Sequence, residues 1–156
     1  MSLRNFLIGL ASAAALPACG NNNNSSTGNP CGPLTNVGAA ITPMSRAGSP
    51  PAMTGGTLVE GTYALTAWDL YNGEHDSKTH QETFLYQGGM VTHVQSINGG
   101  VNQELGGSYS SSGNVFTWTI TCPQPTSVSV QYTATPTTFM FIAPDDPNQL
   151  QTYTKQ

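Results

Sequence analysis

Asn114–Cys122 reads NVFTWTITC and is the clearest strand signal in the chain. Large apolar residues alternate with smaller ones, so Phe116, Trp118 and Ile120 share one face and threonines occupy most of the other. A period of two is the spacing of a half-buried β-strand, whereas a helix would need apolar residues three and four positions apart. The stretch therefore predicts a strand, and no other segment offers a convincing helical stripe of useful length.

Seven further runs of this kind follow one another between residues 58 and 155. They are rich in β-branched and aromatic residues, and Gly, Pro, Ser and Asp separate them, which are residues that favour turns. Gly88–Gly89 and Gly99–Gly100 each favour a two-residue hairpin, because both central positions of such a turn need positive φ. The eight predicted strands are Leu58–Trp68, Glu82–Gln87, Met90–Asn98, Val101–Ser110, Asn114–Cys122, Ser127–Thr135, Thr137–Ala143 and Gln149–Lys155.

Short connections make neighbouring strands antiparallel. A single open sheet of this size would expose two edges, and closure into a barrel removes both of them. On the strand that follows Gly100, we expect Val101, Leu105 and Tyr109 to line one face. The sequence therefore predicts an all-β fold, an eight-stranded antiparallel up-and-down barrel over residues 58–156.

Composition excludes several classes of function. Only 8% of the 156 residues are charged, and a net charge of −4 with four basic residues cannot neutralise a run of phosphates, which excludes a nucleic-acid surface. The sequence has no Gly-x-Ser-x-Gly elbow, no His-Glu-x-x-His and no phosphate-binding glycine loop. We therefore expect a protein that is not an enzyme and that holds neither a cofactor nor a metal.

The N-terminus has the pattern of an export leader. Arg4 precedes the apolar run Phe6–Leu16, which has the length of a signal-peptide core and is shorter than the ~20 residues that span a bilayer. The run closes with Leu16-Pro17-Ala18-Cys19, which resembles the lipobox of bacterial lipoproteins, with proline as an unusual residue at its position.

The lipobox resemblance implies that a signal peptide, residues 1–18, is removed and that Cys19 receives acyl chains. Several acyl chains would hold the protein stably on a lipid bilayer. Gly20 follows in place of the Asp that retains many lipoproteins in the inner membrane, so we expect the bacterial cell envelope and its outer membrane. The alternative is an ordinary secretory leader with Cys19 as a disulfide partner.

Residues 19–57 then form the lipidated cysteine, a tether and an N-terminal segment. Gly20–Asn29 has neither charges nor apolar side chains, so we expect it to stay flexible. Three cysteines are present, and lipidation of Cys19 leaves Cys31 and Cys122 as a pair. An oxidising compartment permits a disulfide between these two, and the alternative is two unpaired thiols.

Eight meandering strands behind an N-terminal segment resemble the lipocalin-like (calycin) barrels. Gly61-Thr62-Tyr63 on the first strand is similar to the Gly-x-Trp motif of that family, with tyrosine in place of tryptophan. The resemblance implies that a basic residue of the last strand, here Lys155, packs over the ring of Tyr63 in a cation–π contact. The alternative is that these two residues are unrelated.

The same resemblance implies a barrel that binds a small apolar or amphipathic ligand beside the membrane. An eight-stranded barrel can also be filled by its own side chains, so the alternative is a non-catalytic structural or interaction lipoprotein with a solid core. A metal-dependent or hydrolytic enzyme is the least supported class, and the sequence names no partner protein. The residues expected to line the ligand are Tyr63, Leu65, Phe84, Trp118 and Tyr132.

Most ionisable side chains of the domain lie between the first two predicted strands. This segment can be a solvated loop, a lid over the mouth of the barrel or a metal site, although its spacing matches no closed zinc motif. His93 lies within a strand, and we expect it to be a hydrogen-bonded strand residue and not a base. The ionisable residues are Asp69, Glu74, His75, Asp76, Lys78, His80 and Glu82.

Overall fold

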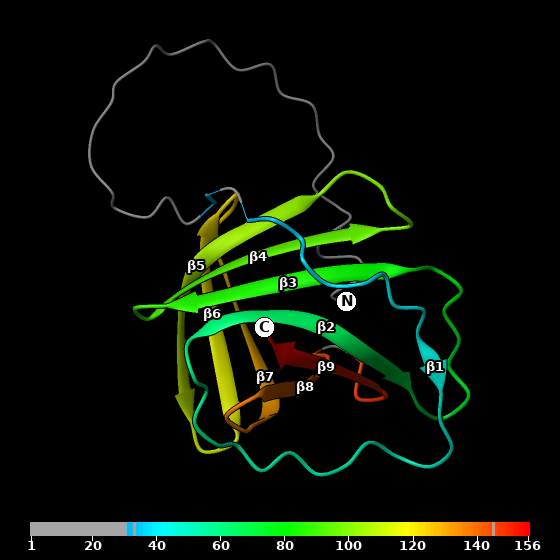
Figure 1. Ribbon diagram of the computed structural model, residues 1–156. Coiled ribbons are helices and arrows are strands. Elements are labelled where there is room, and N and C mark those ends of the chain that lie inside the picture. Colours follow the sequence, from blue (N-terminus) through cyan, green and yellow to red (C-terminus); the bar gives the residue numbers. More distant parts are fainter. Residues whose placement is uncertain (1–30, 33, 145) are drawn as a thin grey trace, which may run out of the picture.

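The computed structural model describes residues 31–32, 34–144 and 146–156, and all regular structure among them is β (Figure 1). The predicted signal peptide, Cys19 and the tether to residue 30 lie outside the described residues. Within those residues we find no helix that could span a lipid bilayer. The strands are β1 (Met44–Ser45), β2 (Gly61–Leu70), β3 (His80–Gln87), β4 (Met90–Ile97), β5 (Gln103–Ser112), β6 (Val115–Cys122), β7 (Thr126–Ala134), β8 (Thr138–Ile142) and β9 (Gln149–Lys155).

Strands β2 to β9 form a closed barrel in which each strand pairs with its neighbour in the sequence. All these pairs are antiparallel, and β9 returns to pair with β2, from Tyr63 opposite Lys155 to Leu70 opposite Gln149. Ring closure leaves no free edge among the eight strands. The predicted eight-stranded antiparallel barrel is confirmed.

Most strand boundaries differ from the prediction by one to three residues, and two of these differences move residues discussed below. Strand β3 begins at His80 and not at Glu82, so His80 belongs to the barrel wall and not to the preceding connection. Strand β5 begins at Gln103, and Val101, expected on the buried face, lies in the turn after β4 with 90% of its surface exposed. The connection between β4 and β5 is therefore longer than Gly99–Gly100 alone. It runs from the end of β4 at Ile97 to the start of β5 at Gln103, which pairs with Gln95.

Aromatic rings fill one end of the barrel. The rings contact one another mostly edge to face, an arrangement that aromatic quadrupoles favour; the centroids of Phe116 and Tyr132 are 5.3 Å apart at an interplanar angle of 66°. Leu105 and Tyr109 pack against this core from β5, as predicted. The fully buried rings at this end are Tyr63, Tyr86, Phe116, Tyr132 and Phe139.

The N-terminal segment completes the barrel wall between β2 and β3. These strands pair only from Gly61 opposite Tyr86 to Ala64 opposite Thr83, and beyond that point they separate. Residues 36–46 lie in the gap (Figure 1). Ile41 exchanges two backbone hydrogen bonds with His80 at 2.7 and 2.8 Å, and β1 pairs with the end of β2.

The approach of this segment to the barrel is close at Gly38. A Cβ atom built there would lie 3.1 Å from the Cβ of Ala64, so a larger residue would push the segment outward. The sequence predicted an N-terminal segment here, after the flexible tether, without assigning its structure. Backbone hydrogen bonds of Ile41 and the pairing of β1 with β2 make this stretch part of the sheet.

Cys31 and Cys122 are joined by a disulfide, as predicted. The two residues are 91 positions apart, and their Cα atoms are 5.6 Å apart. Cys122 is the last residue of β6, so the disulfide fixes the start of the described chain at that end of the barrel. The same end carries the β2–β3, β4–β5, β6–β7 and β8–β9 connections, and we refer to it as the mouth.

Candidate functional site

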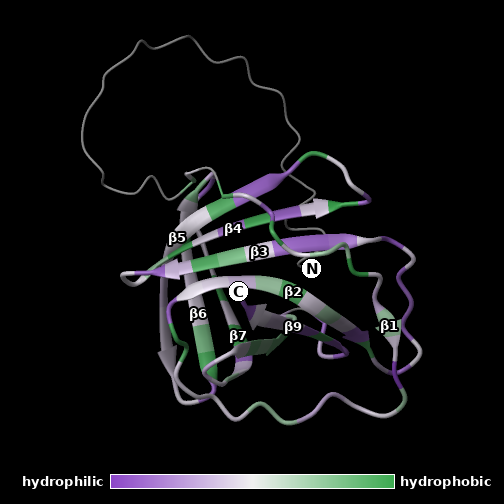
Figure 2. Ribbon diagram, in the orientation of Figure 1, coloured by the Kyte–Doolittle hydropathy of each residue, from purple (hydrophilic) through white to green (hydrophobic). Residues whose placement is uncertain are grey.

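The barrel interior changes from aromatic to polar toward the mouth. Along β3 the inward residues alternate from His80 and Glu82 to Phe84 and Tyr86, and Figure 2 shows hydrophilic residues in the half of β3 that begins at the mouth. Strands β4 and β9 show the same change. The inward polar side chains, each at most 5% exposed, are His80, Glu82, His93, Gln95, Gln149 and Gln151.

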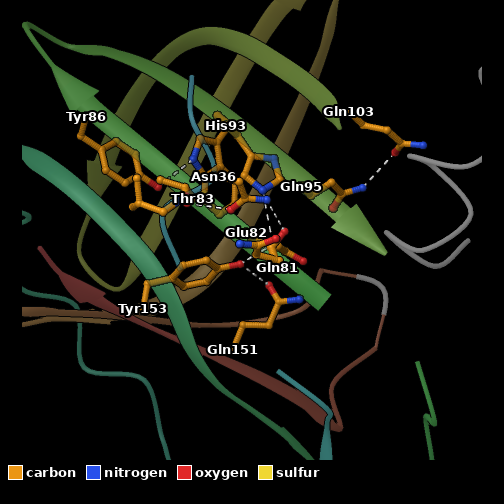
Figure 3. Close-up of polar contacts among 12 residues, drawn as sticks. Asn36, Gln81, Glu82, Thr83, Tyr86, His93, Gln95, Gln103, Gln151 and Tyr153 are labelled. Atoms are coloured by element: carbon orange, nitrogen blue, oxygen red, sulfur yellow. Dashed lines mark hydrogen bonds and ion pairs between the residues drawn. The ribbon is translucent and has the colours of Figure 1, made fainter. Parts of the chain in front are cut away.

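Glu82 lies at the centre of this region. Its Oε2 accepts a hydrogen bond from the Tyr153 hydroxyl at 2.6 Å and lies 3.3 Å from His93 Nε2 (Figure 3). The Tyr153 hydroxyl also lies 3.1 Å from Gln151 Oε1. Neither bond to the carboxylate uses Oε1, so its second oxygen is left as an acceptor. We define the interior polar cluster as these four residues: Glu82, His93, Gln151 and Tyr153.

The interior polar cluster holds a charged carboxylate. Burial by itself would raise the pKa of Glu82, but the hydrogen bond and the charge of His93 and the hydrogen bond from Tyr153 outweigh it, and the pKa is lowered. Burial and the neighbouring Glu82 raise the pKa of Tyr153 well above its ordinary value. At neutral pH the carboxylate is therefore ionised and the tyrosine keeps its proton.

Two buried nitrogens near the mouth have no hydrogen-bond partner in the described part of the chain. They are His93 Nδ1 and Trp68 Nε1, on side chains that are about 5% and 6% exposed. The Trp68 ring lies 4.3 Å from the ring of His80, which bonds Asp76 through Nε2 at 3.0 Å. Buried polar atoms in folded proteins almost always have a partner, so each of these two nitrogens needs an explanation.

A layer of aromatic side chains lies directly beneath the interior polar cluster. The ring of Phe84 stacks on His93 with centroids 4.2 Å apart and meets Tyr153 edge to face at 5.0 Å. Trp118 packs against Phe141 at 5.1 Å and donates a hydrogen bond to Tyr86. The site therefore combines a buried charge with an apolar floor.

The five residues predicted to line a ligand do not form one group. Phe84 and Trp118 belong to the floor beneath the interior polar cluster, and Leu65 lies opposite Tyr153 in the β2–β9 pairing. Tyr63 and Tyr132 lie at the aromatic end, where their hydroxyls donate to backbone oxygens of residues 59 and 56. The structure places Tyr63 opposite Lys155, and the cation–π contact between them stays a prediction.

The β2–β3 connection lies at the mouth and is hydrogen-bonded to the β8–β9 connection. Tyr71 N donates to the backbone oxygen of Asn148 at 2.9 Å, and the Asn72 amide donates to the Asn148 side chain at 2.6 Å. The carboxylate of Glu74 accepts hydrogen bonds from the amides of Asn148 and Gln149. These hydrogen bonds join two connections that are neighbours at the rim, because β2 and β9 are paired strands.

The predicted ionisable segment divides into separate contacts. His80 and Glu82 face the interior from β3, whereas His75 lies outside and contacts Ser45 at 3.0 Å. Asp69 pairs with Arg46 at 2.7 Å. Among the described residues no group of three His, Cys, Asp or Glu side chains is placed to hold a metal ion.

The sequence analysis missed most of the interior polar cluster. His93 was expected to be a satisfied strand residue, but it faces the interior, and its Nδ1 has no partner in the described chain. Glutamines and histidines alternating with Phe84, Tyr86 and Val91 were the available signal, because strand geometry puts every second residue on the same face. Polar residues on an apolar face were not taken as interior.

Comparisons with protein-family models, with curated proteins and with solved structures return no match to this chain.

Proposed function

We propose that this protein is a lipid-anchored protein of the bacterial cell envelope and that its lipocalin-like barrel binds a small amphipathic molecule at the mouth. The observation that supports binding is the incompletely hydrogen-bonded polar interior above an aromatic floor. A charged or polar group of the ligand would meet the interior polar cluster, and its apolar part would contact aromatic side chains. Ligand sites in proteins commonly combine such apolar linings with a few placed polar groups.

A purely structural barrel has little reason to bury this set of side chains. Moving a carboxylate out of water is costly even when it is paired, and each buried nitrogen without a partner costs about 1–3 kcal/mol. Apolar side chains of similar size would fill the same space without that cost, as they do around Phe116 and Phe139 at the other end. The cost is understandable if a ligand completes the hydrogen bonds.

Fluorescence of the two tryptophans tests binding, because Trp68 and Trp118 both lie in the barrel interior. We expect a saturable change in emission when the full-length protein is titrated with medium-chain amphiphiles and with apolar dyes. The variant Trp118→Phe would assign the change to Trp68, the residue nearer the mouth. If no compound gives a saturable change, the result would favour the alternative, an interaction protein with a solid core. The tightly packed aromatic end is compatible with that alternative.

Mass spectrometry tests the anchor. We expect the mature protein to begin at Cys19 and to carry the added mass of acyl chains, and Cys19→Ser to remain unmodified and to leave the membrane fraction. An unmodified Cys19 in the mature wild-type protein would refute the anchor while leaving the binding proposal intact.

A further inference from the structure

The carboxylates of the described chain gather at the mouth half of the barrel. Six of the seven lie there, and only Glu60 lies at the aromatic end. Two cations share the mouth half, Lys78 and Arg46, and Arg46 is already paired with a carboxylate. The six are Asp69, Glu74, Asp76, Glu82, Glu104 and Asp146.

The interior polar cluster offers a carboxylate oxygen that no hydrogen bond among the described residues uses. Glu82 Oε1 is not used by the contacts with Tyr153 and His93, whereas Gln151 Oε1 already lies within hydrogen-bond distance of the Tyr153 hydroxyl. His93 Nε2 lies 3.3 Å from the same carboxylate, and His93 Nδ1 has no partner in the described chain.

A buried carboxylate oxygen in a region rich in acidic side chains favours a ligand that donates hydrogen bonds and carries positive charge. An ammonium group has three donors and no acceptor, and aromatic faces beside it add a favourable cation–π term. An anionic ligand would instead meet Glu82 with no Lys or Arg beside it in the described interior. The negative charges of Glu82 and of such a ligand would repel each other strongly in a buried site.

We propose that the ligand is a small organic cation, a protonated primary amine on an apolar or aromatic body, whose ammonium group bonds Glu82 and its neighbours in the interior polar cluster. This inference rests on the proposed binding function and specifies the chemistry of the ligand. It assigns to Glu82 the recognition of charge and to Phe84 and Trp118 the contact with the apolar body.

Three compounds that share one phenylethyl body provide the test. 2-Phenylethylamine is positive at neutral pH, 2-phenylethanol is neutral and 3-phenylpropionate is negative. We would titrate each into the full-length protein and measure affinity by calorimetry and by tryptophan emission. The amine should bind at least tenfold more tightly than the alcohol, and the acid should bind most weakly.

Glu82→Gln keeps the size of the side chain and removes its charge. We expect this variant to lose the preference for the amine while it still binds the alcohol, which shows that the barrel remains folded. The matched control is Glu60→Gln at the aromatic end, an exposed carboxylate outside the site, and it should keep the preference.

The outcomes separate the inference from the proposed function. Equal binding of amine and alcohol, tighter binding of the acid, or an amine preference that survives in Glu82→Gln would each overturn the inference and leave ligand binding standing. If none of the three binds but another amphiphile does, the inference also fails alone. If nothing binds, the proposed binding function fails with it.

Discussion

Replacing Tyr153 with phenylalanine removes one hydroxyl from the barrel interior and keeps the ring. The hydroxyl donates to Glu82 at 2.6 Å, Tyr153 is fully buried and Glu82 is 4% exposed. A hydrogen bond to a charged group contributes about 1.5–3 kcal/mol, so we expect Tyr153→Phe to lower the free energy of unfolding by about 2 kcal/mol. With a typical urea m-value, this lowers the denaturation midpoint by about 1 M.

The loss should depend on pH in a defined direction. The pKa of Glu82 is lowered in the folded chain, so its ionisation stabilises the fold above the pKa of the unfolded chain, and that contribution is lost as pH falls through the folded value. Tyr153 is one of the groups that lower this pKa. The difference between the wild type and Tyr153→Phe should therefore be largest near neutral pH and should shrink in acid.

Urea denaturation at neutral pH and at about pH 3, below the ordinary pKa of a glutamate, measures both effects. Tyr109→Phe is the matched control, because the Tyr109 hydroxyl contacts the exposed Glu60 at 3.4 Å. We expect that control to cost less than about 0.5 kcal/mol at either pH. Equal losses in the two variants, or a Tyr153→Phe loss that is independent of pH, would refute the reasoning about the buried carboxylate.

Two further predictions concern the stability of the barrel. Reduction of the Cys31–Cys122 disulfide, or its replacement by two serines, should cost about 4–5 kcal/mol from loop entropy over 91 residues, measured by urea denaturation with the oxidised protein as control; an unchanged midpoint would contradict it. Phe139→Ala should cost about 3–5 kcal/mol because it empties a fully buried position, whereas Val101→Ala, at an exposed turn, should change stability by less than about 0.5 kcal/mol; similar losses at both positions would contradict the assignment of the core.

The barrel could be predicted because its information is local. In β6 the alternation of Phe116, Trp118 and Ile120 with threonines marks both the strand and its inner face, and paired glycines mark hairpins. Short connections then make strands that are neighbours in the sequence antiparallel neighbours in the sheet. Closure of the sheet into a barrel follows from the cost of leaving two edge strands unpaired. Each of these steps needs only residues a few positions apart.

The site was harder to predict because its information is not local. Glu82, His93 and Tyr153 come from three strands, and they meet only when β9 closes on β2. The rule that apolar residues mark the inside did not place Glu82 in the barrel interior. The wall formed by residues 36–46 was missed for a related reason: its bonds join residues about 40 positions apart, and no local pattern announces them.

The disulfide at the end of β6 has a geometric consequence for the proposed anchor. Whatever precedes Cys31 is joined to the barrel at the mouth and not at the aromatic end. With acyl chains on Cys19, the short stretch Gly20–Pro30 would be all that separates the lipid from Cys31, so the mouth would lie nearer the lipid than the aromatic end. An amphipathic molecule leaving the bilayer would then meet the carboxylates first, and the crosslink sets the direction of approach as well as adding stability.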